Sequence, residues 1–170
     1  LCNSTQAIRS GAATGASGYT YWARKTADEI LADINDIISA VWTDNDCASD
    51  ALPDHILVRV NQYGLLVTRK VSEDSEKSIL SYVEENNLAA KQGRPLVISP
   101  CKWCSTIGQD SKDRLGCYSN QGDRGCFNLT QPLRRMDTEY AEMRIKIPYI
   151  AQFSEPRLLY PSTIRYLDGI

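Results

Sequence analysis

The first residues whose type and spacing could do chemistry are two cysteines, Cys101 and Cys104, with two residues between them. They follow the apolar run 96–99 in the stretch LVISPCKWC. A Cys-x-x-Cys pair is typical of one half of a zinc site or of a thiol–disulfide redox pair. Either function needs further residues, so the rest of the chain decides whether this pair is a working centre.

A four-thiolate zinc site would need Cys117 and Cys126 as its second pair. Eight residues separate these two, whereas a zinc ribbon repeats the two-residue spacing. A redox pair would begin a helix, but residues 105–116 have the composition of a loop. We therefore expect Cys101 and Cys104 to be free thiols without bound metal that pack as small apolar side chains. A zinc-binding regulatory module that uses Cys101, Cys104, Cys117 and Cys126 remains an alternative.

The other residue patterns do not match a catalytic site. His55 is the only histidine, and it begins an expected strand without a Ser-His-Asp or Cys-His motif around it. The glycines of residues 11–18 neither follow an expected strand nor carry the Lys-Ser/Thr of a phosphate loop. The acids of the stretches DINDI and VEEN fall on solvated helix faces. We expect no catalytic, cofactor-binding or metal-binding residues, no cofactor, no small-molecule substrate and no enzyme activity.

Charge and hydropathy argue against two classes of partner. The formal net charge is −2 and the basic residues are scattered, so we expect no specific nucleic-acid partner. The apolar runs are too short to cross a bilayer, so we expect no membrane partner. The six cysteines come without an export signal, which favours reduced thiols. Because the chain begins without methionine, we expect it to be part of a longer protein.

The strongest helix signal covers residues 26–42. Thr26 and Glu29 stand three residues apart at its start, which predicts a capping box. Apolar residues recur along it at spacings of three and four: Ile30, Ile34, Ile37, Ile38 and Val41. We expect this stripe to pack on the domain core and the opposite, polar face to be exposed.

Further elements follow in the middle of the chain. Residues 62–70 predict a short helix, and residues 75–86 a longer one opened by Ser72 or Ser75. Residues 55–60 and 96–99 have the β-branched, apolar composition of buried strands.

Strand-like segments predominate after Pro100. Among them, Met143, Ile145 and Ile147 alternate with Arg144 and Lys146, which predicts a half-buried strand. Helices come first and strands last, so the fold class is α+β, with a mixed sheet flanked by helices. We expect residues 1–22 to form a flexible connector and residues 23–170 to form a single domain.

The order of these segments resembles the C-terminal region of the major capsid proteins of tailed phages with the Hong Kong 97-type fold, most closely a prophage-borne branch. The resemblance covers most of the chain. It is carried by LCN at Leu1, TADEILADINDIISAVW, LPDHILVRVNQYGLLVTRKVSEDSEKSILSYVEENN, DRLGCYSN, FNLTQPLRRM, MRIKIPYIAQF and YPSTIRYLDGI.

This resemblance implies a structural role in an icosahedral shell. Residues 23–170 would be the axial-type domain, and the partners would be copies of the chain in pentamers and hexamers and other phage head proteins. The location would be the virion capsid, with the bacterial cytoplasm before assembly. An encapsulin-type bacterial compartment shell, which shares the fold, is the alternative.

Overall fold

The computed structural model describes residues 2–155 and 157–170, so Leu1 of the LCN segment lies outside the described residues. The chain divides into two compact units. The first unit consists of Leu1–Asn120 and Tyr160–Ile170, and the second of Gln121–Leu159.

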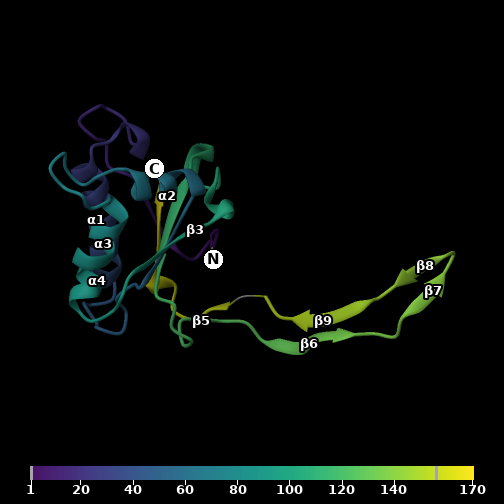
Figure 1. The fold of residues 1–170 in the computed structure, drawn as a ribbon. Coiled ribbons are helices and arrows are strands. Elements are labelled where there is room, and N and C mark those ends of the chain that lie inside the picture. Colours follow the sequence, from purple (N-terminus) through teal and green to yellow (C-terminus); the bar gives the residue numbers. More distant parts are fainter. Residues whose placement is uncertain (1, 156) are drawn as a thin grey trace. The chain divides into compact units, whose positions relative to one another are not determined.

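A five-stranded sheet forms the centre of the first unit (Figure 1). Its order is β1 (Ile8–Gly11), β11 (Ile164–Asp168), β4 (Arg114–Tyr118), β2 (His55–Val58) and β3 (Val97–Pro100). The pairs β1–β11 and β2–β3 are parallel, whereas β4 runs antiparallel to both of its neighbours. The sheet is therefore mixed, and the expected α+β class is confirmed.

Strand β1 lies within residues 1–22, for which we expected a flexible connector. Its four residues pair in parallel register with β11 at the edge of the sheet. The Ala12 N–H continues this pairing by donating to the Asp168 carbonyl oxygen at 2.8 Å. Pairing with a partner more than 150 residues away orders a segment whose own composition carries no strand signal.

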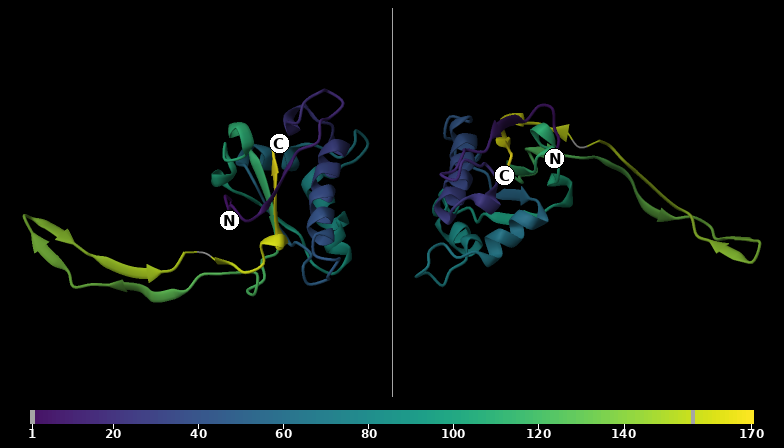
Figure 2. Two further views of the ribbon diagram at one scale, coloured as in Figure 1. Left: turned by 180° about the vertical axis from the view of Figure 1, so that it is seen from behind. Right: turned by 90° about the horizontal axis from the view of Figure 1, so that it is seen from above.

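Helices cover one face of the sheet, as the views in Figures 1 and 2 agree. The helices are α1 (Ala27–Thr43), α2 (Val60–Thr68), α3 (Ile79–Asn86) and α4 (Leu88–Lys91), with 3-10 turns η1 (Trp22–Arg24), η2 (Lys102–Cys104), η3 (Gln109–Ser111) and η4 (Pro161–Thr163). The capping box of Thr26 and Glu29 at the start of α1 is confirmed.

The helix α3 begins later than expected. Ser78 is its N-cap and accepts from the Ser81 N–H, whereas Ser72 and Ser75 were the expected caps. The reason is a closed turn before the helix. Lys70 and Ser78 form an isolated antiparallel β-bridge, and the Val71 N–H donates to the Lys77 carbonyl oxygen. This pairing holds residues 71–77 out of helical conformation.

Among the described residues, no helix is both long and apolar enough to cross a membrane.

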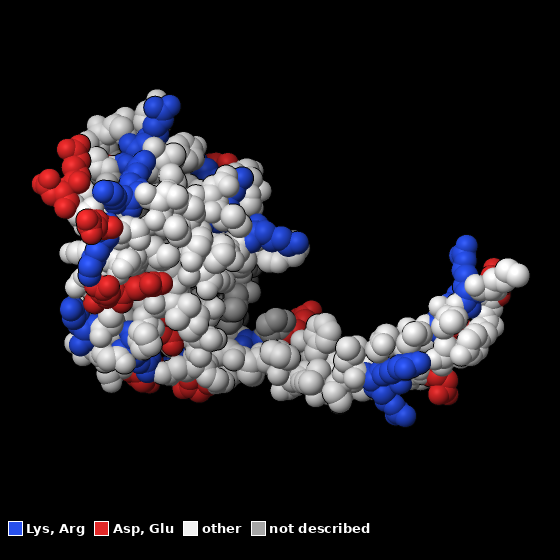
Figure 3. Space-filling view, in the orientation of Figure 1, with Lys and Arg blue, Asp and Glu red and all other residues white. Residues whose placement is uncertain are grey.

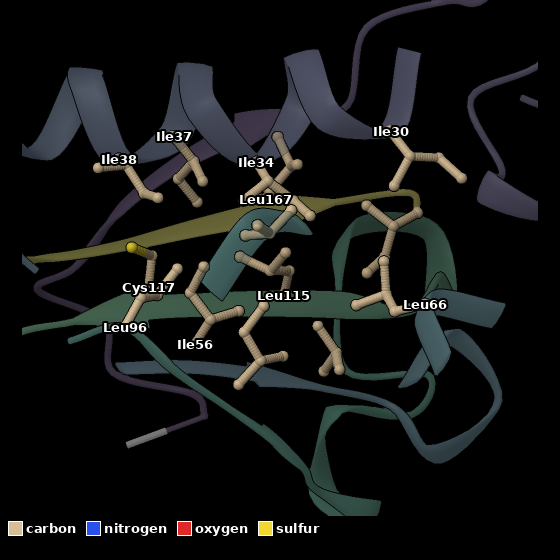
Figure 4. Packing of buried hydrophobic residues seen from close by; sticks show 14 of the residues in the cluster. Ile30, Ile34, Ile37, Ile38, Ile56, Leu66, Leu96, Leu115, Cys117 and Leu167 are labelled. Atoms are coloured by element: carbon tan, nitrogen blue, oxygen red, sulfur yellow. The ribbon is translucent and has the colours of Figure 1, made fainter. Parts of the chain in front are cut away.

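The core lies between α1 and the sheet (Figure 4). All five residues of the predicted α1 stripe are at most 3% exposed. They pack over three strands, with the contacting side chains Ile56, Leu115, Cys117 and Leu167 in the same cluster. Each fully buried isoleucine stabilises the fold by about 1.5–3 kcal/mol. On the opposite face of α1, Asp28 and Asp36 are exposed, as expected.

The other face of the sheet carries the N-terminal segment and residues 101–113 (Figures 1 and 2). The Ser4 N–H donates to the Tyr166 hydroxyl at 3.0 Å, and the Gln109 N–H donates to Asp168 at 3.0 Å. Two stretches distant in sequence are thereby held on one surface.

The second unit is built from paired strands. These strands are β5 (Gly125–Cys126), β6 (Leu129–Arg135), β7 (Glu139–Ala141), β8 (Arg144–Lys146), β9 (Tyr149–Phe153) and β10 (Arg157–Leu158), paired as β5–β10, β6–β9 and β7–β8. All three pairs are antiparallel, so the unit is a long two-stranded hairpin.

The strand expected beside Met143 is present as β8, Arg144–Lys146, but its expected half-burial is wrong. The chain reverses at Glu142 and Met143, and Met143, Ile145 and Ile147 are all exposed. A two-stranded ribbon has no second layer to bury one of its faces, so the alternation of apolar and charged residues gives two exposed faces here.

Candidate functional site

The structure brings together three cysteines, and only two of them belong to the set considered from the sequence. The Cys2 Sγ lies 3.7 Å from the Cys101 Sγ and 3.7 Å from the Cys104 Sγ. All three sulfur atoms lie within 4.8 Å of one another. Cys117 instead lies in the core under the helices, and Cys126 belongs to β5 of the second unit. Cys2 was missed because 99 residues separate it from Cys101 and no local spacing connects them.

Cys2 is positioned by a buried guanidinium. Arg114 of β4 donates through Nη1 to the Cys2 carbonyl oxygen at 3.0 Å and to the Asn3 Oδ1 at 3.2 Å. Arg114 is itself held by Asp168, opposite it on β11, through bonds of 2.6 and 2.9 Å. The sheet register therefore decides where the first cysteine lies.

Within the cluster the three thiols differ. Cys104 is buried, whereas Cys2 and Cys101 are half-buried. A hydrogen bond from Cys104 lowers the pKa of Cys2 to about 6, against the opposing effect of burial. That same hydrogen bond, with burial, raises the pKa of Cys104. Cys104 is therefore the donor of this hydrogen bond and Cys2 the more acidic of these two thiols, while burial in the core raises the pKa of Cys117.

His55 is part of a strand-end contact. Its Nδ1 lies 2.8 Å from the Asp54 Oδ1, and its ring packs against Tyr118 with centroids 5.5 Å apart. The Asp54 carboxylate also accepts the Asn120 N–H at 2.7 Å. These bonds join the start of β2 to the end of β4, which is a structural role.

The acids of the stretch DINDI do not all lie on a solvated face, contrary to expectation. Asp33 is 4% exposed and accepts from the Lys25 ammonium and from Trp22 Nε1, the latter at 2.8 Å. Both donors come from the turn before α1, so this buried pair fixes the entry of the helix. Asp36, in the same stretch, is exposed.

The glycine-rich residues 11–18 do follow a strand, β1, which was not expected. They still lack the Lys-Ser/Thr of a phosphate loop. A pocket between this segment, α1 and β11 has a volume of about 210 Å³ and is lined in part by Ser10, Asp36 and Arg165. Typical small-molecule pockets are larger, roughly 300–1,000 Å³.

The hairpin unit exposes a row of large apolar side chains. Tyr140 and Ile145 stand directly opposite each other on β7 and β8 and are 79% and 65% exposed. Glu139 and Lys146, the next pair, place opposite charges on the other face. The exposed large apolar residues of this unit, among those described, are Phe127, Leu129, Leu133, Met136, Tyr140, Met143, Ile145, Ile147, Tyr149, Ile150, Phe153 and Leu159.

An exposed apolar row of this length marks an interaction surface, because monomeric proteins keep such patches small. On the face shown in Figure 3, most of the hairpin surface carries no charge. On the first unit, the same view shows acidic and basic side chains interspersed. The hairpin is therefore a candidate assembly surface.

Comparison with solved structures finds capsid-like shells. The capsid of Myoviridae phage XM1 aligns with a TM-score of 0.73 and 15% sequence identity, over 96% of this chain and 51% of that one. The virus-like particle from Pyrococcus furiosus aligns with a TM-score of 0.62 and 12% identity, over 97% and 57%. At these identities the likeness shows the fold, and the chain spans about half the length of the structures it matches.

Two further comparisons complete this picture. The holo-SrpI encapsulin complex from Synechococcus elongatus PCC 7942 aligns with a TM-score of only 0.46 and 14% identity, over 99% of this chain and 54% of that one, and we base no argument on it. A search of curated proteins found no match.

The sequence as a whole matches one protein family. The match to the family described as "Major capsid protein" extends over residues 1–170. It confirms the resemblance to phage major capsid proteins that the order of the sequence segments indicated, and the fold agrees with it. The chain belongs to the major capsid protein family.

Proposed function

We propose that this chain is part of the structural subunit of a bacteriophage or prophage icosahedral capsid, and that it builds the shell by self-association. Family membership and the phage-capsid fold support this proposal. The observation that carries it is the hairpin Gln121–Leu159, which exposes an apolar row.

The hairpin needs a partner for its own stability. An isolated two-stranded hairpin is marginally stable in water, and the apolar pairs Tyr140–Ile145 and Leu129–Phe153 are exposed within this chain. Packing against a neighbouring subunit, or against another part of the complete gene product, would remove these side chains from water. In a closed shell each subunit offers a contact surface to one neighbour and receives the matching surface of another.

The proposal includes a division of labour between the two units. The first unit is the axial-type domain, which clusters near the symmetry axes in pentamers and hexamers, and the hairpin makes other contacts between subunits. The role is structural and non-enzymatic, in the virion and, before assembly, in the bacterial cytoplasm. Other phage head proteins are further partners.

An encapsulin-type compartment shell is the second candidate, because cellular compartments use the same fold. Gene neighbours discriminate between the two. Portal or maturation-protease genes beside this one favour the phage shell, whereas a gene for a cargo enzyme favours the compartment.

The test is assembly of the complete gene product that contains these residues. Expressed in bacteria and viewed by negative-stain electron microscopy, it should give rings or closed shells. Ile145→Asp places a charge on the apolar face of the hairpin tip and should abolish shells. Lys146→Gln, on the adjacent residue and the opposite face, is the matched control and should leave them intact.

Two results would contradict the proposal. One is a complete gene product that stays monomeric under all assembly conditions while turning over a substrate. The other is equal assembly by the Ile145→Asp variant and the wild type, which would remove the hairpin from the contacts.

A further inference from the structure

The cysteine cluster has the dimensions of a metal site. In a tetrahedral zinc–thiolate site the Zn–S bonds measure about 2.3 Å, which places neighbouring sulfur atoms about 3.8 Å apart. The two Sγ–Sγ distances from Cys2 are 3.7 Å each, and the third lies within 4.8 Å. A zinc ion therefore needs only a small closing movement of one side chain.

The three ligands come from backbone that is already held in place. The Cys101 N–H donates to the Val58 carbonyl oxygen at 2.7 Å, which continues the pairing of β3 with β2. Cys104 ends the 3-10 turn η2, where its N–H donates to the Cys101 carbonyl oxygen at 3.3 Å. Arg114 fixes the Cys2 carbonyl oxygen, as described above. Such supporting bonds orient metal ligands before the metal arrives.

Burial leaves one side of the cluster open. Cys104 is buried at its base, and Cys2 and Cys101 are half-buried. An ion could therefore enter from solvent and keep a water molecule. Soft thiolate ligands favour zinc over the hard cations magnesium and calcium.

We propose that Cys2, Cys101 and Cys104 bind one Zn²⁺ ion through three thiolates, with the fourth position open to water. The three thiols release their protons as the three Zn–S bonds form. We expected metal-free thiols at Cys101 and Cys104 because eight residues separate Cys117 from Cys126, which is not the two-residue spacing of a zinc ribbon. The structure supplies a different third ligand.

The ion would tie the N-terminal segment to the end of β3, the strand at the opposite edge of the sheet from β1. Cys2 and Cys101 are 99 residues apart, so one metal would close a long loop and restrict the unfolded chain. Zinc that binds only the folded state stabilises the fold by RT ln(1 + c/Kd), where c is the concentration of free zinc, so the melting temperature rises with that concentration.

The experiment uses the complete gene product, reduced with a phosphine under anaerobic conditions and titrated with Zn²⁺ alone. Against a chromogenic chelator we expect one zinc per chain and a higher melting temperature. X-ray absorption of the zinc-loaded wild type should show three sulfur neighbours at about 2.3 Å. Cys2→Ser and Cys101→Ser should each weaken zinc binding by more than about 100-fold, beyond the loss typical of a supporting residue.

Cys47→Ser is the matched control, because Cys47 is exposed on the connection after α1. It should bind zinc like the wild type. The proposal is overturned if the reduced wild type takes up no zinc, if Cys2→Ser binds as tightly as the wild type, or if absorption shows fewer than three sulfur ligands. The absorption measurement on the wild type decides the matter even if a cysteine variant does not fold.

Discussion

At the scale of single residues, Arg114 connects Cys2, Tyr166 and Asp168 on the face of the sheet that the helices do not cover. Its side chain is fully buried, its guanidinium lies 4.5 Å from the centre of the Tyr166 ring, and it forms two hydrogen bonds with Asp168. It also holds the Cys2 carbonyl oxygen. A buried cation without its counter-ion is strongly destabilising, so Asp168 is the residue on which this face depends.

Asp168→Asn should lower the free energy of unfolding by about 3–5 kcal/mol at pH 7, because it leaves a buried charge unpaired. Burial opposes ionisation of Asp168, but hydrogen bonds from Arg114 and the Gln109 N–H outweigh it and hold its pKa below the ordinary value. The ionised carboxylate therefore stabilises the fold at pH values above its unfolded pKa of about 3.9. This contribution is lost as the pH falls through the lower, folded pKa.

Urea unfolding of the wild type and the Asp168→Asn variant, followed by circular dichroism from pH 7 to pH 3, checks this prediction. The stability gap should be constant above about pH 5 and narrow below about pH 4. A gap that does not change with pH would mean that packing, rather than charge, makes Asp168 important.

At the scale of elements, the hairpin tip is strained. Glu142 and Met143 both have positive φ angles, 50° and 61°, between the paired residues Ala141 and Arg144. Two central residues with positive φ are typical of a type I′ turn, which favours Asn-Gly. A non-glycine residue in this region costs roughly 1 kcal/mol or more.

Replacing Glu142 and Met143 by Asn and Gly should therefore stabilise the hairpin by about 1–2 kcal/mol. Stronger cross-strand contacts between Tyr140 and Ile145 in nuclear magnetic resonance spectra would report it. Ala-Ala at the same two positions is the control, because it shortens both side chains and keeps the strain. Equal effects of both double variants would show that side-chain loss, not backbone geometry, is responsible.

At the scale of the whole molecule, the hairpin is an insertion between two neighbouring strands. Tyr118 at the end of β4 pairs with Ile164 at the start of β11, so the chain leaves the first unit and returns to it at adjacent points. The core cluster of the first unit contains no residue of Gln121–Leu159 among the described residues.

Replacing residues 121–159 by a short Gly-Ser linker should leave the melting temperature of the first unit within a few degrees of the wild type. The physical reason is that closing a short loop between paired strands costs little conformational entropy. Shell assembly should be lost at the same time. Differential scanning calorimetry and electron microscopy measure the two effects. Unfolding of the shortened chain would show that the units depend on each other.

The sequence by itself determined several of the local elements and indicated the family. Helix α1, its capping box and its buried stripe follow from spacings of three and four residues, and β2 and β3 follow from short β-branched runs. These signals suffice because the period of the apolar residues matches the geometry of each element. The order of the segments also indicated the capsid family before the fold was known.

Only the tertiary structure decided the candidate sites. The Cys2–Cys101–Cys104 cluster depends on sheet register and on Arg114, which connect residues about a hundred positions apart. The hairpin escaped prediction because its turn at Glu142 and Met143 lacks glycine and asparagine, and because alternation gives the period of a strand without saying whether a second layer covers it. Period is a local property, whereas burial and the meeting of distant side chains are set by which elements pack together.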